Sequence, residues 1–275
     1  MKKEFIIILA ASIGLVVFLA MQPKVVVNNA KEKLQVNTST ANRDKKPAEQ
    51  SASHTKGLSP EQQKKVDALK QKLETATAAQ KVGVIENLML AFSEGNRIDS
   101  AAKYAEGLLA FNDSEVTLLK IADTYYQAYG YALSDEKGNV LGEKAREFYK
   151  KALAKNPQLL KAKTNMAMTY VSTQTPMAGI MLLREVLNED PNYEPALMNI
   201  GLLSMQSKQF EKAADRFRTV LKTNARNTQA EFYLGICLAE LGEKTEARKY
   251  LESVQKKDSD PAIQQAVKET LQSLK

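Results

Sequence analysis

The sequence predicts an all-α protein in which antiparallel helix pairs stack into a solenoid. The first observation is the segment Glu194–Asn227, whose 34 residues hold two amphipathic helical patterns joined by a short polar turn. The second is that segments of matching length lie on both sides, with similar residues at the same offsets. A fixed period of this kind is the sequence signature of a stacked repeat array.

Small residues recur at two positions of three successive segments. The eighth position holds Ala167, Gly201 and Gly235, and the twentieth holds Gly179, Ala213 and Ala247. Large residues follow at fixed distances, namely Leu183, Phe217 and Leu251, then Val186, Val220 and Val254. Because small side chains let two helices approach closely, we expect the small residues at helix contacts and the large ones in the seam between pairs.

This pattern resembles the tetratricopeptide repeat (TPR) family over residues 80–261, which implies a right-handed solenoid. The predicted repeats are 81–114, 115–159, 160–193, 194–227 and 228–261. The sequence departs from the family at offset four, where Lys163, Leu197 and Glu231 replace its Trp, and at offset 27, where Val replaces Ala.

A single helix is predicted on each side of the repeats, within a domain that spans 59–275. The first covers 60–79, because Ser59 can cap it, Pro60 suits the first helical position, and Gln62 completes a capping-box spacing. The second covers 262–274 after Asp260-Pro261 and has a polar outer face. Terminal helices of this kind keep solenoids soluble.

The second repeat carries about eleven extra residues, within 126–142. Eleven residues are close to three helical turns, so both helices are predicted to extend before a turn at residues 135–139. One interpretation is a tolerated insertion at a loop tip. The other is a projecting element that contacts a partner through Tyr125, Tyr129 and Tyr131, since Tyr is favoured at interfaces.

Residues 5–21 form an unbroken apolar run after a basic start. As a helix the run is about 26 Å long, close to the hydrocarbon core of a bilayer. We predict an uncleaved signal anchor in residues 1–22. A cleaved signal peptide is the alternative, although Phe18 occupies a position where cleavage needs a small residue. Residues 23–58 are polar and are predicted to be a disordered linker.

The orientation follows from a resemblance to bacterial signal anchors, in which a short basic start and one span leave the C-terminal part outside. This resemblance implies a single-pass protein of the bacterial inner (cytoplasmic) membrane with a periplasmic repeat domain. Lys2 and Lys3 favour this orientation, whereas Lys24, Lys31 and Lys33 favour the reverse.

The net charge of +7 does not indicate a nucleic-acid partner. Residues 59–275 hold 30 basic and 28 acidic residues, so the predicted folded part is close to neutral and shows no basic stripe. Cys237 and His54 are the only residues of their types, so we predict no catalytic or metal site. No cofactor motif or small-molecule substrate is indicated.

The resemblance implies a concave groove lined by fixed offsets of each first helix. The groove residues carried over are Leu119, Asp123, Tyr126, Lys161, Thr164, Met168, Val171, Met198, Leu202, Met205, Phe232 and Ile236. Some family members also clamp a terminal carboxylate with Asn at offset six and Lys at offsets two and five. Asn165 and Lys161 match two of these positions, but offset five is Thr164.

Methionine side chains adapt to varied apolar surfaces, so the groove is predicted to bind a peptide or helix of an envelope protein. The predicted function is therefore a membrane-anchored protein–protein interaction adaptor without enzymatic activity. The alternative is a chaperone-like subunit for envelope or cytochrome c assembly that handles unfolded substrates. A further possibility is that the C-terminal helix or another repeat covers the groove.

Overall fold

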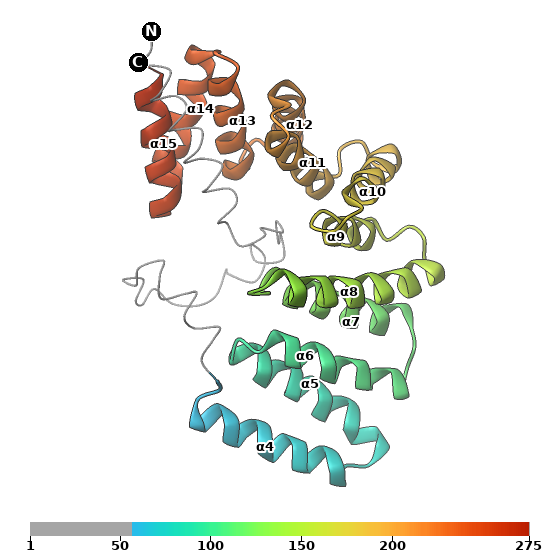
Figure 1. Ribbon diagram of the computed structural model, residues 1–275. Helices are drawn as coiled ribbons and strands as arrows, with labels where there is room; N and C mark the ends of the chain where they lie inside the picture. The colour runs from blue at the N-terminus through green and yellow to red at the C-terminus, as the bar shows by residue number, and fades with distance from the viewer. Residues whose placement is uncertain (1–56, 275) are drawn as a thin grey trace. The chain divides into compact units, whose positions relative to one another are not determined.

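The computed structural model describes residues 57–274, where the chain forms twelve α-helices, one short 3-10 helix and no β-strand (Figure 1). The predicted all-α class is confirmed for this part. No helix among the described residues has both the length and the apolar character of a membrane span. The predicted anchor at 5–21 and nearly all of the predicted linker at 23–58 lie outside these residues.

The described residues fall into two compact units, 57–179 and 180–274, each of which is described by itself below. The division falls inside α10 (Pro176–Glu189).

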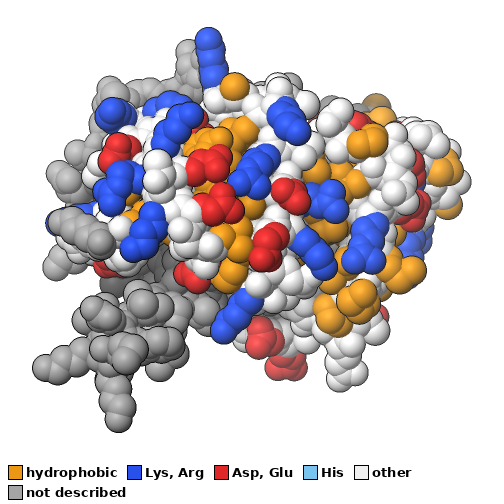
Figure 2. All heavy atoms as spheres, turned by 90° about the horizontal axis from the view of Figure 1, so that it is seen from above, with side chains coloured by type: hydrophobic (Ala, Val, Ile, Leu, Met, Phe, Trp, Pro, Cys, Tyr) orange, Lys and Arg blue, Asp and Glu red, His pale blue; other side chains and the backbone are white. Residues whose placement is uncertain are grey.

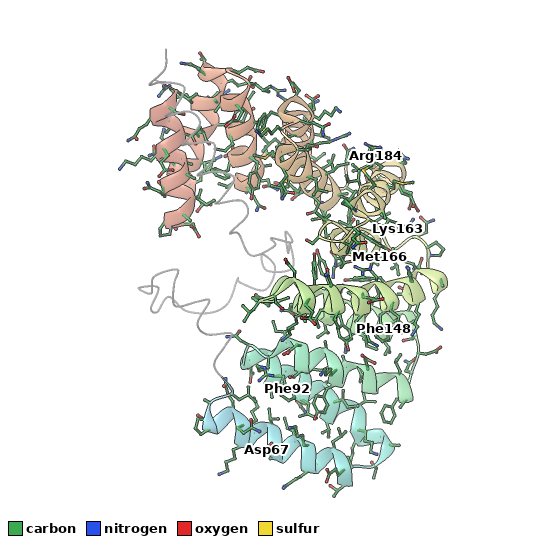
Figure 3. The ribbon with its side chains drawn as sticks, in the orientation of Figure 1. Asp67, Phe92, Phe148, Lys163, Met166 and Arg184 are labelled. Atoms are coloured by element: carbon green, nitrogen blue, oxygen red, sulfur yellow. The ribbon has the colours of Figure 1, made fainter. Side chains whose placement is uncertain are left out.

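The N-terminal unit is a series of helices in which each packs against the next. Its elements are α4 (Pro60–Thr75), α5 (Ala78–Glu94), α6 (Ile98–Ala105), the 3-10 helix Glu106–Ala110, α7 (Glu115–Gly130), α8 (Asp135–Lys155) and α9 (Leu160–Tyr170). Aromatic pairs fill its interior: Phe92 stacks on Tyr104 and Phe148 on Tyr125, with ring centroids 5.3 Å and 5.9 Å apart. Phe92 and Phe148 are labelled in Figure 3.

The first helix is shorter than predicted. It ends at Thr75, and α5 begins at Ala78, before the predicted start of the first repeat. The reason lies in local capping, since the Thr77 backbone N–H donates to Gln80 Oε1 at 3.1 Å. Satisfying this free N–H favours a new helix start at this point.

The extra residues of the second repeat lengthen both helices, so that α7 has 16 residues and α8 has 21. The turn lies at residues 131–134 and not at 135–139. Ser134 caps α8, and its Oγ accepts a hydrogen bond from the Lys137 backbone N–H at 3.3 Å. The acidic residues Asp135 and Glu136 therefore lie in the first helical turn, where the helix dipole stabilises them.

The C-terminal unit contains the regular repeats. After the end of α10 come α11 (Glu194–Gln206), α12 (Phe210–Thr223), α13 (Thr228–Glu240), α14 (Lys244–Lys257) and α15 (Pro261–Ser273). Phe217 and Leu251 are fully buried. A Cβ built on Gly201 would lie 2.7 Å from Phe217 Cε1, and one on Gly235 would lie 2.8 Å from Leu251 Cγ. The small residues of the repeat pattern thus make room for the large ones.

Three first helices end in the same way. Asn96, Lys208 and Gly242 follow α5, α11 and α13, and their φ angles are 56°, 58° and 80°. After α11, the Gln209 N–H donates to Ser204 O at 2.8 Å and the Lys208 N–H to Met205 O at 2.9 Å. This pair of bonds is the Schellman motif, which satisfies the last carbonyls of a helix through a left-handed residue.

Candidate binding surface on the first helices

Helices α7 and α9 open successive repeats of the N-terminal unit and lie side by side. Asp123 on α7 joins them, because Lys161 Nζ lies 2.9 Å from its Oδ2 and Asn165 Nδ2 donates to its Oδ1 at 3.3 Å. Further along, Tyr129 Oη donates to Ser172 Oγ at 3.3 Å. The predicted groove residues Asp123 and Lys161 are thus in direct contact.

A third helix completes this polar cluster. Tyr149 on α8 donates from Oη to Asp123 Oδ1 at 2.5 Å, and Asn165 Nδ2 lies 3.1 Å from the same hydroxyl. Burial, together with the neighbouring Asp123 carboxylate, raises the pKa of Tyr149 well above its usual range. The phenol therefore stays protonated and acts as a donor.

Three of the predicted apolar residues remain partly exposed beside the cluster. Leu119 lies one turn before Asp123 on α7, Met168 follows Asn165 on α9, and Val171 is the C-cap residue of α9. We call the surface formed by Leu119, Asp123, Lys161, Asn165, Met168 and Val171 the α7–α9 face. The Asp123 and Lys161 side chains are 37% and 64% exposed, so the charged pair is accessible.

Two other predicted residues of this unit are buried. Thr164 is 1% exposed and donates from Oγ1 to Leu160 O at 2.8 Å. Tyr126 is 6% exposed and packs edge-on against the Tyr149 ring. Its hydroxyl has no hydrogen-bond partner among the described residues. Both side chains support the surface from beneath.

In the C-terminal unit, most of the predicted groove residues are buried. Four belong to the hydrophobic core, namely Met198 (0% exposed), Met205 (5%), Phe232 (3%) and Ile236 (2%). Leu202 is partly buried and packs against the same core. Asn199, the second offset-six Asn, is 2% exposed, and its Oδ1 has no partner within the described part of the chain. Leu202 is therefore the accessible member of this group.

The tyrosines of the long hairpin are mostly interior. Tyr125 and Tyr129 are each 3% exposed, whereas Tyr131 is 37% exposed. Tyr125 donates from Oη to Glu106, and a Cβ built on Gly142 of α8 would lie 3.2 Å from Tyr129 Cδ2. These two rings pack the extended helices against each other, so the hypothesis of partner contact in this hairpin depends on Tyr131.

Sequence reasoning missed Tyr149 and Arg146. Arg146 on α8 donates from Nη1 to Thr169 O at 2.8 Å and places its guanidinium 4.8 Å from the centroid of the Tyr170 ring. Both residues lie on a second helix, where the repeat offsets assign no groove position. One sequence signal points to Tyr149, which follows the small residue Ala145 by four positions, as Phe217 follows Ala213.

Cys237 is fully buried, and burial raises the pKa of its thiol to about 12. Its thiolate is therefore scarce near neutral pH, which removes the nucleophilic form. Among residues 57–274, no group of three or more His, Cys, Asp or Glu side chains is placed to hold a metal ion. On the face seen in Figure 2, basic and acidic side chains are interspersed.

The geometry defines a class of protein, namely one built from helical hairpins that repeat with small residues at the helix contacts. Residues 204–269 match the family model described as tetratricopeptide repeat. This part of the chain is thus similar to the tetratricopeptide repeat family.

Solved structures are similar to this chain, and the first of those below, with a TM-score above 0.5, shares its fold. A tetratricopeptide repeat protein from Parabacteroides merdae ATCC 43184 has a TM-score of 0.55 and 14% identity, over 76% of this chain and 90% of that chain. A MamA protein has a TM-score of 0.49 and 18% identity, over 65% and 92%. YrrB, described as a TPR protein with an unusual peptide-binding site, has a TM-score of 0.46 and 14% identity, over 74% and 98%. No curated protein matches the sequence.

Proposed function

We propose that this protein is a membrane-anchored adaptor that binds a peptide or helix of another envelope protein. The observation that carries the proposal is the α7–α9 face. There two adjacent first helices present partly exposed apolar residues next to an accessible charged pair. Apolar contact area supplies affinity, and the charged groups at its edge select orientation and partner.

The binding surface of this proposal is narrower than the groove predicted from the offsets. It consists of the α7–α9 face alone. In the C-terminal unit, Met198 and Met205 lie in the core, so that unit contributes no surface to the proposal.

Site-specific photocrosslinking in cells tests the surface. A photoreactive phenylalanine analogue at Leu119 or Met168 is expected to capture one stoichiometric protein. The same analogue at Lys150, which is exposed on the second helix α8, serves as the matched control and is expected to capture none. Equal capture from all three positions, or from none, would reject the surface. Capture of many unfolded proteins would favour the chaperone-like alternative.

The anchor and its orientation form a separate part of the proposal. The support is the apolar run at 5–21, which the sequence supplies. We expect the full-length protein in the membrane fraction and a chain lacking residues 5–21 in the soluble fraction. We also expect added protease to digest the repeat domain in spheroplasts. Protection of the domain until the membrane is dissolved would place it on the cytoplasmic side.

A further inference from the structure

Three hydrogen-bond donors from two helices converge on one carboxylate in the α7–α9 face. They are Lys161 Nζ, Asn165 Nδ2 and Tyr149 Oη, at 2.9 Å, 3.3 Å and 2.5 Å from the Asp123 oxygens. A cation with two neutral donors is a good environment for a carboxylate, since charge-assisted hydrogen bonds are the strong ones. The three donors thus form a carboxylate-binding site whose occupant comes from the same chain.

We propose that Asp123 occupies this carboxylate-binding site in cis and thereby makes the α7–α9 face reject partner segments that present a free carboxylate. The proposal deepens the function proposed above, on which its consequence for partner choice rests. A partner carboxylate that approached Lys161 would meet a cation already paired and a second negative charge beside it. Like charges brought together at an interface are a recognised source of specificity.

The arrangement favours occupancy by Asp123 over a bridging external anion. Asp123 accepts from donors on α8 and α9 at once, and the Tyr149 ring that carries one donor is fully buried. Tyr149 and Asn165 also bond to each other at 3.1 Å, so the donors hold their positions independently of Lys161. Loss of the Asp123 carboxylate therefore leaves a preformed site, with an accessible ammonium group at its edge.

The test replaces Asp123 and offers the site a small external carboxylate. N-acetylalanine carries a free carboxylate like that of a peptide C-terminus, and its methylamide is the matched neutral probe. Full-length protein labelled with 15N-asparagine reports binding through the side-chain amide of Asn165. We expect Asp123→Ala to bind N-acetylalanine about tenfold or more tightly than the unchanged protein, and not to bind the methylamide.

Further variants keep the test decisive. Asp123→Ser also removes the carboxylate and leaves room for an external one, so it is expected to gain binding even if Asp123→Ala does not fold. Asp123→Ala combined with Lys161→Met is expected to lose the gain. Equal binding by the unchanged protein would overturn the proposal, as would folded Asp123 variants that bind neither probe. The titration needs no protein partner, so failed crosslinking at Leu119 and Met168 leaves its outcome unaffected.

Discussion

The α7–α8 hairpin and the α11–α12 hairpin share one repeat pattern but pack by different means. In α7–α8, the interior is rich in tyrosine, and Tyr125, Tyr129 and Tyr149 each find a hydrogen-bond partner. In α11–α12, Gly201 lies against the ring of Phe217. Three of the buried phenol hydroxyls of this hairpin bond to polar groups, and through Tyr149 this packing places polar groups at the surface. The α11–α12 hairpin instead relies on the close fit of a small residue against a large ring.

This difference separates the roles of the two hairpins. The polar groups that satisfy Tyr149 also form the α7–α9 face, so packing and candidate binding chemistry share residues there. In α11–α12 the predicted groove residues Met198 and Met205 belong to the core instead. We therefore expect substitutions in α11–α12 to change stability most, and substitutions around Asp123 to change recognition with a smaller cost in stability.

The largest expected effect is at Phe217. Phe217→Ala removes a fully buried ring, so we expect the free energy of unfolding to fall by about 3–5 kcal/mol. Urea denaturation followed by circular dichroism measures this fall in the free energy of unfolding. Phe111→Ala is the matched control, since Phe111 is 38% exposed and its loss is expected to cost about 1 kcal/mol or less. Similar costs at both positions would contradict the close fit assigned to α11–α12.

A smaller loss is expected at Gly201. An added Cβ would lie 2.7 Å from Phe217 Cε1, so Gly201→Ala must displace the ring and is expected to cost about 1–3 kcal/mol. Gly83→Ala on α5 is the control, because nothing lies within 4 Å of its added Cβ. Higher helix propensity should then stabilise the protein by about 0.5–1 kcal/mol. Thermal or urea unfolding measures the change in stability of both variants. A change of the same sign in both would reject the steric explanation.

The tyrosine-rich hairpin is tested by removing one hydroxyl. Tyr149→Phe keeps the ring but takes a donor from Asp123, so we expect a loss of about 1 kcal/mol in the free energy of unfolding. Combining it with Asp123→Ala closes a double-mutant cycle, in which the coupling is expected to be about 1 kcal/mol. Additive losses would mean that the hydroxyl and the carboxylate do not stabilise each other.

The sequence was sufficient for the repeated architecture because its signals are local. Helices α7, α9, α11 and α13 begin at Glu115, Leu160, Glu194 and Thr228, which are the first residues of the segments found by the repeat offsets. Small residues at fixed offsets mark helix contacts wherever the helices pack closely. At the Thr77–Gln80 cap, a different local signal competes with the repeat pattern. There α5 begins at Ala78, before the predicted start of the first repeat.

The candidate surface was less predictable. An offset tells which side of a helix a residue occupies, but not how much of that side other helices cover. The offsets assign all four of the following residues to the groove. Asp123 and Lys161 form an accessible ion pair, whereas Met198 and Phe232 are buried. Tyr149 reaches the cluster from a second helix. Its contribution depends on how α8 packs against α7 and α9, which no repeat offset encodes.

The smallest expected effect concerns the turn that ends α11. Lys208 has a φ of 58°, a left-handed conformation that costs a non-glycine residue roughly 1 kcal/mol, whereas the equivalent residue after α13 is Gly242. Lys208→Gly is therefore expected to raise the free energy of unfolding by up to about 1 kcal/mol. Gly242→Ala, with no atom near the added Cβ, is expected to lower it by about as much. Urea denaturation of the two variants should show opposite shifts of the midpoint. Loss of stability in both would mean that the Lys208 side chain makes contacts that outweigh its backbone strain.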